Sequence, residues 1–88
     1  MNIARYFGED IEAPLKNYRF LRGALKAEVK EFIEKLPEPH RTFAMYRYVE
    51  CYTMERIAEK MNYSPRNMYV FRNKVLKWWS FFLEQGMH

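Results

Sequence analysis

Two helix-start signals stand close together in the second half of the chain and leave room for only a short helix between them. Thr53 precedes the run Met-Glu-Arg-Ile-Ala, and Ser64 is followed directly by a proline. A hydroxyl accepts a hydrogen bond from the first turn of a helix, and proline is tolerated there because that turn does not use its missing N–H group. Asn62, between the two signals, suits a left-handed turn. The pattern predicts a short helix, a turn of about three or four residues, and a second helix that ends at Gly86.

The first half of the chain has the spacing of one long amphipathic helix. Apolar residues recur three and four positions apart over residues 15–36, interrupted only at Arg22. The sequence Leu36-Pro37-Glu38-Pro39 ends this helix, because a residue before proline is disfavoured in the α region. Pro39 then suits the first turn of a further helix, which runs to about Glu50. The apolar seam consists of Leu15, Tyr18, Leu25, Val29, Phe32 and Leu36.

These elements predict an all-α fold of about four to five helices, in which a long N-terminal amphipathic helix precedes a helix-turn-helix. No segment alternates apolar and polar residues as a half-buried strand does. A chain of 88 residues is short enough to form one compact domain. We expect that domain to combine an N-terminal segment and helix at 1–36 with a helix-turn-helix region at 37–88.

Composition excludes several other classes of protein. The three glycines leave no Gly-rich phosphate loop, and the single cysteine, Cys51, excludes an internal disulfide framework and a multi-cysteine zinc site. No apolar run reaches the roughly 18 residues that a membrane span needs, so we expect no membrane partner. The lone thiol and the lack of a basic-then-apolar leader pattern predict a cytoplasmic protein.

Catalytic chemistry finds little support in the sequence. His40 and His88 are isolated, and Cys51 has no nearby histidine that would activate its thiol. Glu55 and Glu59 have the spacing of a solvated helix face. We therefore expect no enzyme, no catalytic residue, no cofactor and no metal site.

The positive charge of the chain is unevenly placed. The net charge of +4 comes wholly from residues 39–88, because residues 1–38 sum to zero. Between Lys60 and Leu83 there are five cations and no acid, which is typical of a phosphate-facing surface. Charge alone leaves open a solvated helix face that binds nothing. The five cations are Lys60, Arg66, Arg72, Lys74 and Lys77.

Helical spacing gives the last helix an inward and an outward face. The inward face is expected to hold Met68, Phe71, Val75, Leu76 and Trp79. The outward side chains are of the kinds that contact DNA, since arginine pairs with guanine, asparagine with adenine, and valine or tyrosine packs against a thymine methyl group. We predict base reading at Arg66, Asn67, Tyr69, Val70 and Asn73, and phosphate contacts at Lys74 and Lys77.

A series of short motifs covers residues 36–79. In order they are Leu36-Pro37, Arg41, Tyr48-Val49-Glu50, Thr53-Met54-Glu55-Arg56-Ile57-Ala58-Glu59, Ser64 and Met68. In this order they resemble the C-terminal promoter-reading domain of sigma-70-type factors, and the helix ahead of them resembles that of small phage and mobile-element transcription activators. Cys51 and Asn62 stand in place of glycines of the sigma pattern, and Pro65 and Val70 in place of hydrogen-bonding side chains. We therefore expect a DNA target other than the usual promoter element.

The resemblance implies a sequence-specific transcription regulator that inserts the helix Ser64–Lys77 into the major groove of double-stranded DNA. It implies a further base contact at Pro65 and phosphate contacts at Thr53 and Arg56, to which we add Lys60. RNA polymerase or a sigma factor is the partner through which such a protein would alter transcription.

The run Trp78-Trp79-Ser80-Phe81-Phe82-Leu83 is apolar on every side of a helix. Such a helix is either buried or anchors a protein interface. This leaves a homodimer open, and it also defines a second functional class: a protein-interaction module that binds RNA polymerase or a sigma factor without reading DNA. The candidate interface residues are Leu25, Val29, Phe32, Trp78 and Phe82.

Overall fold

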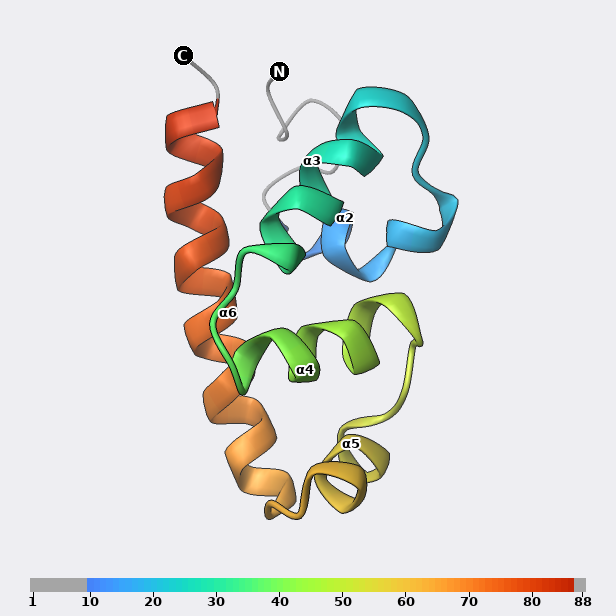
Figure 1. The fold of residues 1–88 in the computed structure, drawn as a ribbon, viewed down its shortest axis with the longest axis vertical. Helices are drawn as coiled ribbons and strands as arrows, with labels where there is room; N and C mark the ends of the chain where they lie inside the picture. The colour runs from blue at the N-terminus through green and yellow to red at the C-terminus, as the bar shows by residue number, and fades with distance from the viewer. Residues whose placement is uncertain (1–9, 87–88) are drawn as a thin grey trace.

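The molecule is built around one long C-terminal helix against which the other helices pack. In chain order the elements are α2 (Ala13–Lys16), η1 (Tyr18–Phe20), α3 (Gly23–Glu34), α4 (His40–Ala44), η2 (Met45–Val49), α5 (Met54–Met61) and α6 (Pro65–Gly86). The computed structural model describes residues 10–86, and these contain helices and no strands, which confirms the all-α class. In Figure 1, α6 runs along one side of the molecule, with α4 and α5 beside its first half and α2 and α3 toward its C-terminal end.

The single helix expected over residues 15–36 does not form, and three shorter elements replace it. The chain breaks before α3, where Leu21 and Arg22 are extended and Gly23 has a φ of 64°. Glycine adopts this backbone conformation without the steric cost of a Cβ. The apolar spacing continues across the break because residues on both sides of it, such as Leu15 and Val29, are fully buried in the same core.

The helix expected from Pro39 to Glu50 changes type part-way. It begins as α4 and continues as η2, a π-helix in which the backbone N–H of Glu50 donates to the carbonyl oxygen of Met45 at 2.9 Å. The wider turn shifts the side chains that follow around the helix axis. Within this element Tyr48 is fully buried, whereas Met45 is 40% exposed.

The boundaries predicted for the last two helices are confirmed. Thr53 Oγ1 accepts a hydrogen bond from the backbone N–H of Arg56 at 3.2 Å and so caps α5. Asn62 ends α5 in the left-handed conformation, with a φ of 60°. Ser64 Oγ accepts from the backbone N–H of Asn67 at 3.4 Å in the first turn of α6, which then continues to its predicted end.

One hydrophobic core joins the N-terminal segment to the C-terminal half of the chain. At its centre the ring of Trp79 is fully buried, and its centroid lies 4.9 Å from that of Phe32 on α3. Trp79 Nε1 also donates to the carbonyl oxygen of Ile11 at 2.7 Å. These contacts fasten α3 and the segment before α2 to α6. Residues 1–9 of the expected N-terminal segment lie outside the described part of the chain.

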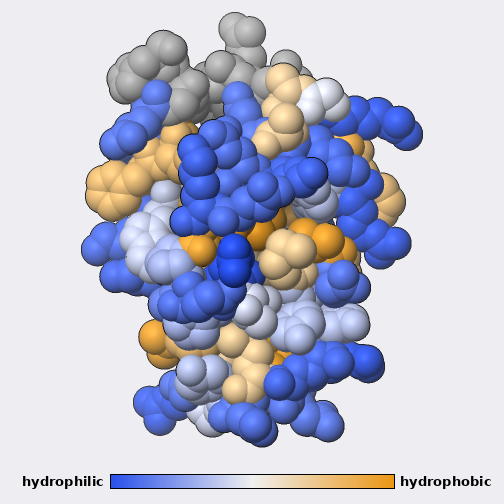
Figure 2. Space-filling view, in the orientation of Figure 1, coloured by the Kyte–Doolittle hydropathy of each residue, from blue (hydrophilic) through white to orange (hydrophobic). Residues whose placement is uncertain are grey.

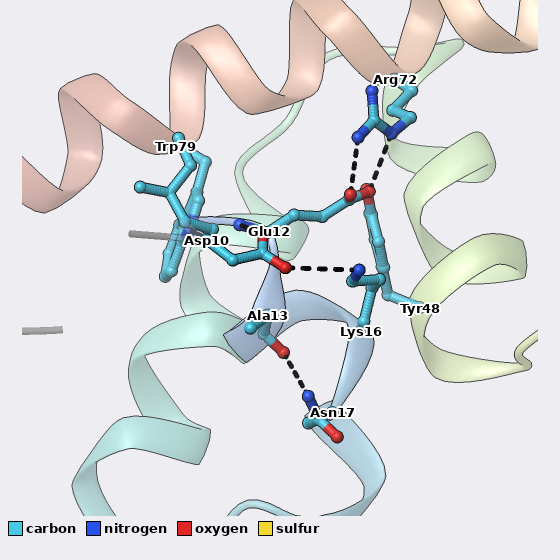
Figure 3. Close-up of polar contacts among 9 residues, drawn as sticks. Asp10, Glu12, Ala13, Lys16, Asn17, Tyr48, Arg72 and Trp79 are labelled. Atoms are coloured by element: carbon cyan, nitrogen blue, oxygen red, sulfur yellow. Dashed lines mark hydrogen bonds and ion pairs between the residues drawn. The ribbon is translucent and has the colours of Figure 1, made fainter. Parts of the chain in front are cut away.

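A buried carboxylate ties three elements together (Figure 3). Glu12 is 5% exposed and accepts hydrogen bonds from Arg72 Nη2 at 2.7 Å, Arg72 Nε at 3.0 Å and Tyr48 Oη at 2.8 Å. Burial by itself raises the pKa of Glu12, but the hydrogen bonds from Arg72 and Tyr48 and the charge of Arg72 outweigh burial and lower it. Glu12 therefore stays ionised at neutral pH and holds α6 and η2 to the N-terminal segment.

The connection from η2 to α5 turns at Cys51, which has a φ of 62°. This left-handed conformation is rare for a residue that has a Cβ. The turn brings the chain back on itself, so that the backbone N–H of Tyr52 donates to the carbonyl oxygen of Tyr46 at 2.9 Å. Arg47 Nη1 closes the turn by donating to the carbonyl oxygen of Tyr52 at 2.9 Å.

Replacing Cys51 with glycine is expected to raise the free energy of unfolding by about 0.5–1 kcal/mol. The left-handed conformation costs a residue with a Cβ about 1–2 kcal/mol, and the greater backbone freedom of glycine in the unfolded chain offsets part of the gain. Urea unfolding measures the change. Cys51→Ala is the control, because it removes the thiol but keeps the Cβ. A glycine variant less stable than the alanine variant would contradict the backbone explanation.

Candidate nucleic-acid interface

The first half of α6 has one mainly polar, exposed face, and its opposite face packs into the core. All the residues predicted to read bases are exposed, and Tyr69 and Val70 remain 51% and 58% accessible. On the opposite face Met68 and Val75 are fully buried, as the spacing predicted. The N-cap at Ser64 fixes where the helix begins, so this face has one orientation relative to the core. The exposed set is Pro65, Arg66, Asn67, Tyr69, Val70, Asn73, Lys74 and Lys77.

The exposed face of α6 carries fewer positive charges than the acid-free segment 60–83 as a whole, because the Arg72 side chain does not lie on this face. Arg72 was one of the five cations of the acid-free segment, but its guanidinium turns to the core and pairs with Glu12. Arg66, Lys74 and Lys77 take part in none of the ion pairs formed within residues 10–86. Lys74 Nζ lies 5.2 Å from the ring centroid of Trp78, which favours one position of this long side chain.

A second group of cations lies on α5, which packs against α6. Arg56 and Lys60 are exposed, and their charged groups lie 4.6 Å and 5.5 Å from the ring centroid of Tyr52. Thr53 is exposed as well, and its hydroxyl is occupied by the cap of α5. Tyr52 was not among the residues predicted from the sequence. It lies two residues before α5 begins, so helical spacing did not indicate its contact with Arg56 and Lys60.

The predicted protein-interface residues divide into two groups. Val29 and Phe32 are 0% and 5% exposed, so their assignment to an interface is corrected: they belong to the core of this chain. Leu25, Trp78 and Phe82 are half-buried. In that region an open groove of about 410 Å³ is bordered by Trp78 and Phe82 together with Leu36, Pro37 and the 52% exposed Phe81. Figure 2 shows apolar patches of this kind set among a mainly hydrophilic surface.

His40 and Cys51 have different surroundings. His40 lies against the rings of Phe71 and Trp78, with centroids 4.9 Å and 5.0 Å away, and burial followed by the charge of Lys74 lowers its pKa. Cys51 is exposed in its turn, and His88 lies outside the described residues. Within residues 10–86 no group of three or more His, Cys, Asp or Glu side chains is placed to hold a metal ion. No helix in that part of the chain is long and apolar enough to cross a membrane.

Comparison of the chain with family models, curated proteins and solved structures finds no match. Function must therefore be argued from the surface just described.

Proposed function

We propose that this protein is a sequence-specific regulator of transcription that binds double-stranded DNA by inserting the Ser64–Lys77 part of α6 into the major groove. The observation that carries the proposal is the exposed face of α6: it combines arginine, asparagine and apolar side chains with flanking lysines and contains no acid. The major groove admits an α-helix, and these side-chain types match the base edges displayed there.

The contacts that anchor the first half of α6 support this proposal. A helix reads bases only if its exposed side chains keep a fixed register on the duplex, and contacts that hold the helix lower the cost of ordering it on binding. The cap at Ser64, the buried side chains of Met68 and Val75 and the ion pair of Arg72 supply such contacts within the first half of α6.

The charge of the exposed α6 face supports the same surface. Arg66, Lys74 and Lys77 take part in none of the ion pairs formed within residues 10–86, and residues 60–83 contain no acid. Their positive charge is therefore available to DNA phosphates, whose neutralisation dominates affinity.

Arg66→Ala and Asn67→Ala are each expected to reduce the preference for the cognate duplex over a scrambled duplex by about tenfold, because one good base contact is worth about 1–3 kcal/mol of discrimination. The cognate duplex is first selected from a random pool with the unaltered protein, and binding is followed by fluorescence anisotropy. Arg22→Ala is the matched control, since Arg22 is exposed in the loop before α3. An unchanged preference in both test variants, or an equal loss in the control, would contradict this mode of reading.

A second candidate function is a protein-interaction module that binds RNA polymerase or a sigma factor. The groove beside Trp78, Phe81 and Phe82 is the observation that favours it, because exposed aromatic clusters anchor protein interfaces. The substitution Phe81→Ser separates the two candidate functions. If α6 reads bases, the variant keeps the DNA preference of the unaltered protein. If the groove alone acts, the unaltered protein regulates transcription without binding DNA, and the variant loses that regulation.

A further inference from the structure

The second group of cations is organised by a pair of stacked tyrosines. The rings of Tyr46, on η2, and Tyr52, before α5, are nearly parallel, with an interplanar angle of 23° and centroids 5.6 Å apart. Arg56 lies over Tyr52 at 4.6 Å, and Lys60 lies 5.5 Å and 5.9 Å from the centroids of Tyr52 and Tyr46. We call these four residues the tyrosine–cation cluster.

The backbone explains why the four side chains meet. Arg56 and Lys60 are four residues apart and so share one side of α5, and Tyr52 lies just before the N-cap of that helix. The left-handed turn at Cys51 folds Tyr52 back to Tyr46, and Arg47 holds that turn through the carbonyl oxygen of Tyr52. The cluster therefore joins two elements through backbone contacts that do not depend on the cations.

The two cations remain free to bind an anion. Both side chains are exposed, and within residues 10–86 neither forms an ion pair, although Glu55 and Glu59 lie on the same helix. An aromatic face attracts a cation without neutralising it, so it limits the positions of a long side chain while leaving the charge available. Two positioned cations on one side of a helix suit the oxygens of a phosphate.

We infer that Tyr46 and Tyr52 are positioning residues that hold Arg56 and Lys60 as a preformed clamp for the backbone phosphates of DNA. The inference rests on the proposed function, because α6 must engage the duplex for α5 to reach its backbone. It adds to that function two tyrosines that act through the cations rather than by touching bases. The clamp fixes the position of the protein on the duplex and carries no sequence preference.

The test is a double-mutant cycle on the full chain, read as affinity for the selected duplex and as its dependence on salt. Log K falls as log salt concentration rises, and Arg56→Ala is expected to reduce the steepness of that fall by about 0.9, the value for one phosphate contact. Tyr52→Leu is expected to weaken binding about three- to fivefold, which corresponds to one cation–π contact. Tyr52→Phe keeps the aromatic face and is expected to bind like the unaltered protein. The affinity of the Tyr52→Leu/Arg56→Ala double variant is expected to lie within about twofold of that of Arg56→Ala alone.

Tyr18→Leu is the matched control, because it removes a comparable cation–π contact, with Lys26, away from α5. If Tyr52→Leu proves unfolded, Tyr46→Leu with Lys60→Ala provides the same cycle. The inference is overturned if Tyr52→Leu binds like the unaltered protein, if the two changes multiply, or if the control loses as much affinity. If the Arg66 and Asn67 variants lose base preference while Tyr52→Leu binds the duplex like the unaltered protein, the clamp alone is overturned. An unaltered protein that binds no duplex would overturn the proposed function and the clamp together.

Discussion

Replacing Arg72 with alanine is expected to lower the free energy of unfolding by about 2–3 kcal/mol. The change leaves the Glu12 carboxylate, whose side chain is 7% exposed, without the guanidinium that donates to both of its oxygens. Breaking a fully buried pair from one side costs about 3–5 kcal/mol, and the 34% exposure of the Arg72 side chain places the expected loss just below that range. Urea unfolding measures the loss.

Lys35→Ala is the control for this prediction. It removes the exposed pair with Glu31, in which the two side chains are 70% and 53% accessible, and such pairs contribute about 0.3–0.5 kcal/mol. Equal losses in the two variants would show that the Glu12 pair is no more stabilising than a surface pair.

The same pair makes stability depend on pH in a defined direction. The pKa of Glu12 is lowered in the folded protein, so folding is favoured by ionisation of this group. Its contribution is complete above the ordinary carboxyl pKa and is lost as the pH falls through the lowered value. Glu12→Gln is therefore expected to be less stable than the unaltered protein at pH 7, with a difference that narrows in acid.

Trp79→Ala is expected to lower the free energy of unfolding by about 3–5 kcal/mol, the usual cost of removing a large aromatic side chain from a core. Trp79 is fully buried, packs against Phe32 and Phe82 and donates to the carbonyl oxygen of Ile11. Its removal leaves a cavity and an unpaired carbonyl in the segment before α2.

Trp78→Ala is the comparison for Trp79, since the two residues are neighbours on α6 and differ in burial. Trp78 is half-buried at the edge of the groove, where it contacts His40 and lies beneath Lys74. We expect about 1 kcal/mol for this change, as for a partly exposed side chain with few core contacts. Equal effects of the two substitutions would contradict the described core.

Local sequence signals predicted where α5 begins and ends and where α6 begins. The caps at Thr53 and Ser64 and the left-handed turn at Asn62 each depend on one or two neighbouring residues, so they could be recognised without the rest of the molecule. The outward face of α6 followed from helical spacing for the same reason. Its exposure is confirmed, and its binding of DNA stays a prediction.

Contacts between segments that are distant in sequence could not be predicted from such local signals. Apolar spacing predicted one helix over 15–36 because it records which residues reach the core and does not detect extended backbone at Leu21 and Arg22. Glu12 and Arg72 lie far apart in sequence, so the ion pair between them could not be predicted from the neighbours of either residue. The π-helix Met45–Val49 likewise has no simple sequence signature.

The most direct test of the central proposal is a titration of the isotope-labelled protein with the selected duplex, followed by amide correlation spectra. We expect saturable changes concentrated at Arg66, Asn67, Val70 and Asn73 on the exposed face of α6, with a second group at Arg56 and Lys60. Changes confined to the groove around Trp78–Gln85, or no saturable change at all, would contradict it.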